Sequence, residues 1–289
     1  MHVSGKGVAL LPIQPRVQYD LCSIIPMTAE ITVARQQQKK QPARTSATAD
    51  HPKRVLKKRS EAIIDLAIDL FNEHGLQNVA TNRISAVLGI SPGNLHYHFS
   101  TKTDIFLAAM ARMERDMRNA LSDLPSSRDM PAEDAVAYDI GVFTVLWKYR
   151  FIFGSLDLFI RWDDKIYLAY MQFHDWIIGR LSQMLVRAIA LGQTKPLKAP
   201  SSPAAFSLMV WLQWEGWVRW EMIQNSRTSH PADADEAIIH RGVLHHIAFM
   251  EPYGTAAFSR DATAAAEAWL TRALKDRRRR RTPVRPGTT

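Results

Sequence analysis

A short run of small and polar side chains in the first half of the chain has the composition of a surface that reads duplex DNA. Pro92 and Gly93 are small enough to let a helix enter the major groove, and the Asn94 carboxamide can pair with the edge of an adenine. His96 and Tyr97 follow, and each can donate to a phosphate or lie against a thymine methyl group. The run therefore predicts contact with DNA, if the chain presents it on one face of a helix.

Other chemistries have less support in the sequence. Two histidine pairs, His96 with His98 and His245 with His246, have spacings that could suit a metal, but neither has a cysteine or carboxylate cluster beside it. Serine, histidine and aspartate are present without a nucleophile-elbow motif. No glycine-rich loop has the spacing that cradles phosphate. We therefore expect no catalytic site, no metal and no cofactor.

Two helices must hold the polar run in place from its N-terminal side. Residues 60–73 have an amphipathic pattern, with Ser60 as a plausible N-cap and Gly75 as a left-handed C-cap. A short second helix is expected to begin at Thr81, a favourable N-cap residue, and to end at Gly89. The first helix buries a stripe formed by Ile63, Ile64, Ala67, Ile68, Leu70 and Phe71.

A tight turn then leads into the helix that carries the polar run. Gly89 supplies the positive φ, Ile90 fills the core, and Ser91 caps a third helix whose first residue is a proline. Leu95 and Phe99, four residues apart, anchor that helix inward. The pattern is typical of a helix-turn-helix, and a fourth helix is expected to begin near residue 102.

This stretch resembles the TetR family of bacterial regulators over residues 57–117. The resemblance rests on residues 67–75, on the Gly-Ile-Ser turn at 89–91, and on the Gly-Asn-Leu-His-Tyr-His-Phe-Ser-Thr-Lys sequence at 93–102. It implies that Thr81, Asn94, Tyr97, His98 and Lys102 lie at the DNA or shape the surface that faces it. The sequence departs from the family where His96 replaces a common aromatic residue and where Ser100 replaces a common lysine.

The candidate DNA-binding residues from the pattern and the resemblance are Thr81, Asn82, Arg83, Ser91, Pro92, Gly93, Asn94, His96, Tyr97, His98 and Lys102.

The positive charge of the chain lies mostly outside this helix-turn-helix. Residues 35–59 hold nine basic residues and one acid, and residues 272–285 hold eight and one. Since the whole chain carries +9 and these segments carry +8 and +7, the rest carries −6. The body at 60–121 has five basic and seven acidic residues, so nonspecific affinity should depend on the arm before it. The arginine run at 277–281 fits a phosphate-binding arm and a solvated tail equally well.

The second half of the chain is predicted to be helical and rich in aromatic residues. Aromatic side chains at helical spacing usually form core, and the resemblance adds a ligand pocket and a dimer face to this half. Residues 204–226 and 233–251 match the family's two dimer helices. The candidate pocket residues are Trp147, Phe151, Phe159, Tyr170, Phe173 and His174, and the candidate dimer residues are Trp211, Trp214, Trp217, Val218 and Met222.

These patterns predict an all-α protein, with a three-helix DNA-binding domain that contains the helix-turn-helix and a larger helical ligand-binding and dimerisation domain. The expected divisions are a disordered basic arm at 1–52, the DNA-binding domain at 53–121, the larger domain at 130–276 and a disordered arginine-rich tail at 277–289. Met27 could be the true start of translation. The single cysteine, Cys22, fits a reducing cytoplasm, and no apolar run is long enough to span a membrane.

The leading hypothesis is a homodimeric regulator, a repressor released from a palindromic operator by a small hydrophobic effector. Operator DNA, a second copy of the chain and that effector are its expected partners. A helical ligand carrier with a degenerate helix-turn-helix is the alternative, and the acidic body at 60–121 favours it. A nucleic-acid-modifying enzyme is a third hypothesis, for which the sequence offers no catalytic constellation.

Overall fold

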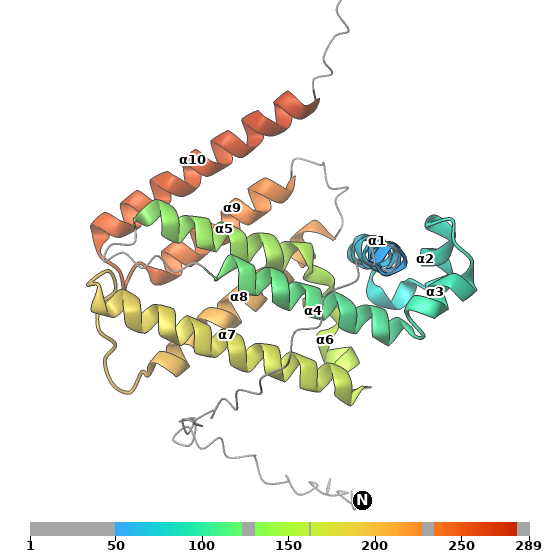
Figure 1. The fold of residues 1–289 in the computed structure, drawn as a ribbon. Helices are drawn as coiled ribbons and strands as arrows, with labels where there is room; N and C mark the ends of the chain where they lie inside the picture. Colours follow the sequence, from blue (N-terminus) through green and yellow to red (C-terminus); the bar gives the residue numbers. More distant parts are fainter. Residues whose placement is uncertain (1–49, 123–130, 162, 227–233, 282–289) are drawn as a thin grey trace, which may run out of the picture. The chain divides into compact units, whose positions relative to one another are not determined.

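The computed structural model describes residues 50–122, 131–161, 163–226 and 234–281, and it confirms the all-α fold class within these ranges. The expected arm before residue 50, the tail after residue 281, Cys22 and Met27 all lie outside them. The elements in chain order are α1 (Asp50–His74), the 3-10 turn η1 (Leu76–Asn78), α2 (Thr81–Val87), α3 (Pro92–His98), α4 (Lys102–Ala120), α5 (Ala132–Lys148), α6 (Arg150–Ile160), α7 (Asp164–Ala190), α8 (Pro203–Asn225), α9 (Ala234–Met250) and α10 (Ala256–Arg281) (Figure 1).

Local signals define the small N-terminal domain formed by α1 to α4. Gly75 and Gly89 have φ angles of 80° and 66°, which end α1 and α2 in the left-handed region that favours glycine. The Ser91 hydroxyl accepts a hydrogen bond of 3.2 Å from a backbone N–H in the first turn of α3. Thr101 and Asp104 form a capping box at the start of α4. The starts of α3 and α4 therefore have side-chain partners for the backbone groups that a helix end leaves open.

The core of this domain lies on the faces that the sequence pattern predicts. Ile63, Ala67 and Phe71 of α1 are at most 1% exposed, and Leu95 anchors α3 at the same degree of burial. Ile90, in the turn, packs partly buried against the same core. Burying a side chain of this size contributes about 1.5–3 kcal/mol, so these anchors fix the position of α3.

The larger domain consists of α5 to α10, and its main contacts pair α7 with α8, α9 with α10, and α5 with both α9 and α10 (Figure 1). Aromatic rings from different helices fill its centre. Phe143 of α5 lies edge-on to Trp217 of α8 with ring centroids 4.7 Å apart, and Trp211 contacts Phe153 and Phe173. Aromatic pairs of this kind add about 0.5–1.5 kcal/mol to their area burial, so this cluster holds α5, α6, α7 and α8 together.

Gly242 allows α9 to approach this aromatic cluster closely. A Cβ atom at this position would lie 2.5 Å from the Phe143 ring and 2.8 Å from the Trp217 ring. Both rings are buried, with at most 4% exposure, and have little room to move. Only glycine fits here without displacing a ring.

Several helix boundaries differ from the sequence prediction. α1 begins at Asp50, so Ser60 lies inside the helix and the predicted Ser60 N-cap is wrong. The basic residues 53–59 belong to the same helix, and Pro52 is tolerated in its first turn. Thr81 is the first residue of α2, preceded by Ala80 as a cap without a side-chain hydrogen bond, so the predicted Thr81 N-cap is wrong. α10 continues to Arg281, and the predicted order limit at 276 is wrong because alanine and arginine continue a helix readily.

Candidate functional site

The exposed face of α2 and α3 carries most of the residues predicted to contact DNA. Asn82 and Arg83 of α2 and His96 of α3 are exposed, and Tyr97 projects with 72% of its surface accessible. Ser91, Pro92 and Gly93 are exposed at the start of α3 as well. Small residues at the N-terminal end and polar residues after them match the requirements of a helix that enters the major groove.

Three of the predicted residues are less accessible than the pattern suggests. Thr81, Asn94 and His98 are half-buried, and the Asn94 carboxamide oxygen is covered, without a hydrogen-bond partner among the described residues. Bidentate pairing of Asn94 with adenine therefore needs a rotation of its side chain. The His96 ring is held by a backbone group. Its Nδ1 lies 3.1 Å from the carbonyl oxygen of Ser100, just after the C-terminal end of α3.

Lys102 joins the start of α4 to the turn after α1. Its ammonium donates to the carbonyl oxygens of Leu76 at 3.0 Å, Val79 at 3.3 Å and Gln77 at 3.4 Å. Burial lowers the pKa of this lysine. All three donors of an ammonium can be engaged in this way, so Lys102 stabilises the loop before α2 and is not directed at a phosphate.

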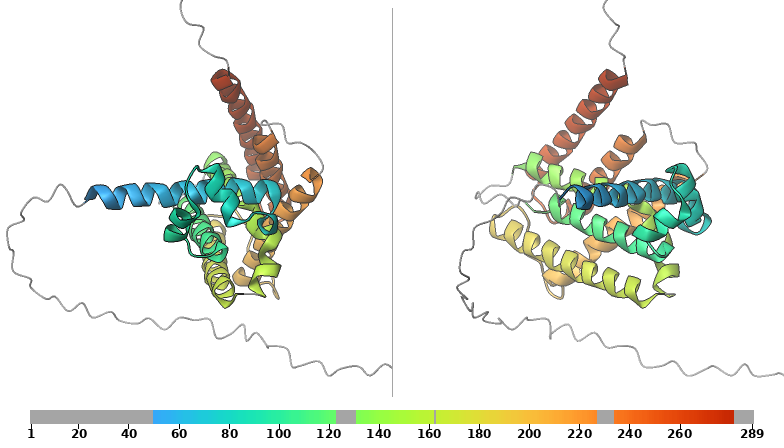
Figure 2. Two further views of the ribbon diagram at one scale, coloured as in Figure 1. Left: turned by 90° about the vertical axis from the view of Figure 1, so that its right-hand side faces the viewer. Right: turned by 45° about the vertical axis from the view of Figure 1, so that its right-hand side comes forward.

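The positive charges in the body of this domain are largely paired with its acids. Arg112 lies 2.6 Å from Asp65 and 3.5 Å from Glu61, and Arg118 bonds to Glu114 one turn away. Lys58 and Arg59 of α1 are exposed, and the first turns of that helix extend away from the other helices (Figure 2). Lys58 and Arg59 of α1 and Arg83 of α2 are therefore among the exposed positive charges of this domain.

Polar contacts connect the DNA-binding domain to the junction between α5 and α6. The Asn72 carboxamide of α1 donates to the Lys148 carbonyl at 2.8 Å and accepts from the Phe151 amide at 3.1 Å. On the other side of the junction, Asp116 of α4 accepts from the Tyr149 hydroxyl at 2.7 Å and from the Lys148 ammonium at 3.0 Å. The junction is thus held by α1 and α4 together.

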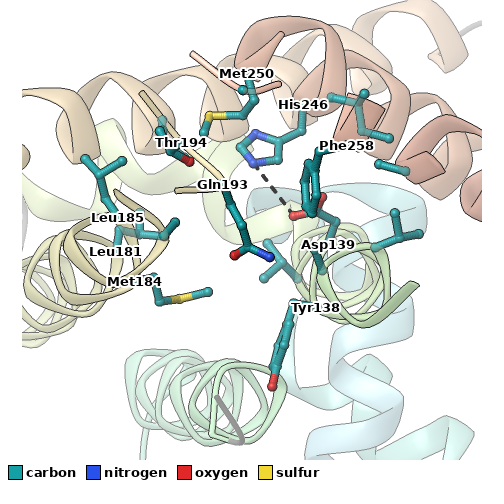
Figure 3. Close-up of a pocket in the computed structure, with 18 of the residues that line it drawn as sticks. Tyr138, Asp139, Leu181, Met184, Leu185, Gln193, Thr194, His246, Met250 and Phe258 are labelled. Carbon is teal, nitrogen blue, oxygen red and sulfur yellow. Dashed lines mark ion pairs between the residues drawn. The ribbon is translucent and has the colours of Figure 1, made fainter. Parts of the chain in front are cut away.

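A cavity of about 170 Å³ lies among α5, α7, α8, α9 and α10 in the larger domain. Its wall is mainly aliphatic, and α7 contributes Leu181, Met184 and Leu185 (Figure 3). Asp139 of α5 and His246 of α9 point toward each other across it, with Oδ1 and Nε2 3.7 Å apart. Together with Tyr138 these two side chains are the titratable groups of the wall, to which Gln193, Thr194, Ser207 and Ser259 add uncharged polar groups (Figure 3).

The side chains predicted for the ligand pocket lie elsewhere, and none of the six lines this cavity. Phe151 and Phe159 pack on Phe71 and Phe106, each pair with centroids 5.2 Å apart, which joins α6 to α1 and α4. The remaining predicted residues are Trp147, which donates to Asp235, Tyr170, which donates to Glu215, Phe173, which is buried, and His174, which lies beside Asp175. Two of the six, Trp147 and Phe151, line a second pocket beside the junction between α5 and α6, so their part in ligand binding stays a prediction.

The dimer-face prediction is also corrected. Trp211, Trp214, Trp217 and Val218 are at most 4% exposed within a single chain, and Met222 is half-buried against Gly154 of α6. The opposite face of α8 is apolar as well, and it is exposed at Leu208, Met209, Leu212, Trp220 and Ile223. Two apolar faces share this helix, and the sequence pattern selected the one that faces the core.

The sequence reasoning missed Asp139, although a signal was present. Asp139 is the single acid between residues 135 and 147, in a stretch that is otherwise almost entirely apolar. An isolated acid on a buried helix is uncommon and calls for a structural or functional explanation. Asn72 gave no such signal, because it lies at the polar edge of an amphipathic helix.

Comparisons with known proteins agree with this architecture. Residues 63–109 match the family model described as "Bacterial regulatory proteins, tetR family", and residues 112–261 match the model described as "Bacterial transcriptional repressor". The second match covers more than half of the chain. The protein is a DNA-binding transcriptional regulator, and it belongs to the TetR family.

Individual relatives support the same conclusion. The chain is 35% identical over 149 residues to the nucleoid occlusion factor SlmA of Actinobacillus pleuropneumoniae serotype 5b, which covers 48% of this chain and 70% of the relative. An HTH-type transcriptional regulator of Staphylococcus aureus, SAB2452, is 32% identical over 69 residues, or 24% of this chain and 36% of the relative. A crystal structure of a TetR-family regulator from Marinobacter aquaeolei superimposes with a TM-score of 0.62 and 27% identity, covering 73% of this chain and 98% of that chain.

Within the described ranges, none of the helices combines the length and the apolar character that crossing a bilayer requires.

Proposed function

We propose that the protein is a homodimeric repressor that binds a palindromic operator at the nucleoid and releases it when a small, largely apolar effector enters the cavity in the larger domain. The observation that carries this proposal is the connection through α5. This helix contributes Val136, Asp139 and Val142 to the cavity wall, and it ends at the junction that Asn72 and Asp116 hold.

The reading face of α2 and α3 supports the DNA-binding part of the proposal. Tyr97 and His96 are exposed beside Asn82 and Arg83, and the anchor Leu95 is buried. One such helix contacts only a few base pairs, so a second copy related by a two-fold axis gives a site long enough to be specific. We infer that Tyr97 contacts the DNA directly and that Lys102 acts by holding the loop before α2.

The exposed apolar face of α8 supports the second copy as the dimer partner. Leu212 follows Leu208 by four residues and Ile223 follows Leu212 by eleven, or about one and three helical turns, so the three lie on one side of the helix. Gly216 lies in the same stripe, and among the described residues no atom outside its own stretch of helix lies within 4 Å of the place a Cβ would occupy. A large apolar face without a cover within the chain is typical of a homodimer interface.

The position of α5 supports the coupling of the cavity to the DNA-binding domain. Residues 139 and 148 are nine positions apart, or about 13 Å along the helix axis. A ligand that displaces α5 at Asp139 would therefore shift Lys148 and Tyr149 at its end, and through them α1 and α4. Release follows if the ligand binds more tightly to the displaced arrangement than to the DNA-bound one.

A gel-shift titration with the DNA upstream of the protein's own gene tests the DNA-binding proposal. At about 50 mM salt we expect retardation by the wild-type protein and at least tenfold weaker binding by Tyr97→Ala, because each specific contact contributes about 1–3 kcal/mol. Tyr167→Ala removes an exposed tyrosine from α7 and serves as the matched control. Equal affinity of all three proteins contradicts the assigned face, and absence of any retardation favours a ligand carrier.

Sedimentation analysis tests the dimer face separately. Leu212→Lys places a charge in the middle of the exposed α8 stripe and is expected to yield monomers. Val186→Lys, at a similarly exposed position of α7, is expected to leave the dimer intact. A Leu212→Lys protein that remains dimeric with wild-type affinity excludes this face of α8.

A further inference from the structure

The cavity in the larger domain has one acid and one imidazole in an otherwise uncharged wall. Asp139 comes from α5 and His246 from α9, and their side chains are 18% and 12% exposed. The side chains that α7, α8 and α10 contribute are uncharged, the segment after α7 adds the Gln193 carboxamide and the Thr194 hydroxyl, and Tyr138 beside Asp139 is the other titratable residue of the wall. No lysine or arginine is part of the lining. Among the residues that line the cavity, a negative charge on Asp139 would therefore have no lysine or arginine beside it, and the imidazole of His246 is its neighbour.

The hydrogen bond of His246 to α8 fixes which of its nitrogens carries the proton. The Trp214 indole N–H can only donate, and it lies 3.3 Å from His246 Nδ1, which must therefore accept. In the neutral ring the proton is then on Nε2, which is the nitrogen that faces Asp139. Trp214 also packs against the ring edge-on with centroids 5.5 Å apart, so the imidazole has a fixed orientation.

Burial keeps both groups uncharged near neutral pH. It raises the pKa of Asp139 to about 8 and lowers the pKa of His246 to about 4. A carboxyl that holds its proton in an apolar cavity will release it when a cation arrives to take its place, because the pair of opposite charges is less costly to bury than the lone carboxylate. The neutral imidazole, with its proton toward Asp139, can support the carboxylate that forms.

The remaining wall specifies the apolar part of such a ligand. Leu181, Met184 and Leu185 of α7 and Phe258 of α10 surround the space into which Asp139 points (Figure 3). The volume of about 170 Å³ is close to that of an apolar protein cavity that accepts benzene. An anion would face Asp139 without any positive side chain, so carboxylates and phosphates do not suit this wall.

We propose that the effector is a compact aryl or alkyl amine, whose protonated nitrogen pairs with the Asp139 carboxylate and whose apolar body lies between α7 and α10. This inference rests on the proposed effector-controlled function, whose cavity it uses, and it adds the chemical class of the ligand. The amine binds as a cation and Asp139 gives up its proton to solvent. The charge of the cavity is thereby balanced.

Isothermal titration of the full-length protein with three compounds of one skeleton tests the ligand class. The probes are 2-phenylethylamine, 2-phenylethanol and phenylacetate, which have nearly the same size and carry a cation, a neutral donor and an anion. We expect the amine to bind at least tenfold more tightly than the alcohol, since a charge-assisted hydrogen bond is stronger than a neutral one, and phenylacetate not to bind. Equal binding of amine and alcohol, a preference for phenylacetate, or no binding of any probe at millimolar concentration would overturn the proposal.

Two variants on α5 locate the interaction. Asp139→Asn keeps the shape of the side chain and is expected to abolish the preference for the amine, with binding of the alcohol unchanged within threefold. Asp134→Asn changes an exposed acid on the same helix and is expected to keep the wild-type preference. An amine preference that survives in Asp139→Asn contradicts the proposal.

Proton release gives a readout that needs no variant. Amine binding by the wild-type protein at pH 7 should release close to one proton, measured by titration in two buffers of different ionisation enthalpy, and its affinity should rise between pH 6 and 8. Uptake of a proton, or no exchange at all, would overturn the assignment to Asp139. Gel shifts with the amine present then test the proposed function independently: an amine that binds without releasing the operator contradicts effector control and leaves the ligand class standing.

Discussion

The face of α2 and α3 and the cavity among α5, α7, α8, α9 and α10 are built in opposite ways. The first is defined by local features, which are two glycines with positive φ, a serine cap and a buried leucine within residues 75–95. The second brings together residues from Leu121 to Ala262, and each of them is ordinary within its own helix. Local constraint gives a surface of fixed shape, whereas a cavity made by long-range packing can change when any of its helices moves. That difference suits a rigid reader controlled by an adaptable sensor.

Matched glycine substitutions give the largest expected difference between the two regions. Gly242→Ala places a Cβ against the buried rings of Phe143 and Trp217 and should lower the free energy of unfolding by about 3 kcal/mol. Gly89→Ala meets no atom within 4 Å, and its cost of about 1 kcal/mol comes only from the positive φ. Urea unfolding followed by circular dichroism measures both. Equal costs for the two substitutions contradict the contrast between packing and local backbone constraint.

Lys102→Met tests whether the DNA-binding domain also depends on a contact between residues that are far apart in the sequence. The substitution keeps the length of the side chain but removes the three hydrogen bonds to the carbonyls of residues 76, 77 and 79, and we expect a loss of about 2 kcal/mol in stability. Operator affinity should fall as a consequence, because the loop before α2 loses its support. Lys165→Met removes an exposed lysine from the first turn of α7 and is the control, with a loss below about 0.5 kcal/mol. Unchanged stability together with weakened binding would show that Lys102 contacts phosphate directly.

The pH dependence of stability between pH 6.5 and 8 tests the protonation of Asp139 in the cavity. The folded-state pKa of Asp139, about 8, lies above its ordinary value of 3.8, so its contribution to stability is largest at low pH and is lost as the pH rises through 8. His246 has the opposite effect, but only below its ordinary value of 6.5. From pH 6.5 to 8 we therefore expect Asp139 to lower stability by about 1.5 kcal/mol.

Urea midpoints of wild type, Asp139→Asn and Asp134→Asn across this range measure the effect of Asp139. The Asp139→Asn protein should lose the decline, and the Asp134→Asn protein should retain it. The same decline in all three proteins would assign it to another group.

The contrast also explains what the sequence could predict. Capping residues, glycine turns and an amphipathic stripe are local, so the elements from α1 to α4 and the reading face follow from residues 60 to 102 with small errors at their ends. In α8, by contrast, the stripe with Trp214 and Trp217 and the stripe with Leu212 and Ile223 have the same helical period. Which of them faces the core depends on where α5 and α9 lie, and no local pattern contains that information.

The hydrogen bonds of Asn72 join the DNA-binding domain to the larger domain, and their removal has the smallest expected effect on stability. Asn72→Ala loses the hydrogen bonds to the Lys148 carbonyl and the Phe151 amide, for a cost of about 1 kcal/mol. The stacked contact of Phe106 on Phe159 persists and keeps α6 attached to the DNA-binding domain, so global unfolding changes little.

Hydrogen exchange separates this local effect from a general one. Amides of α1 near residue 72 should exchange about fivefold faster in Asn72→Ala, as expected for a loss of about 1 kcal/mol in local stability, whereas amides of α7 and α8 should not change. Asn119→Ala, at an exposed position of α4, should leave both regions unchanged. Faster exchange throughout α7 and α8 would mean that the two regions unfold as one unit, and the separation between a rigid reader and an adaptable sensor would then have to be abandoned.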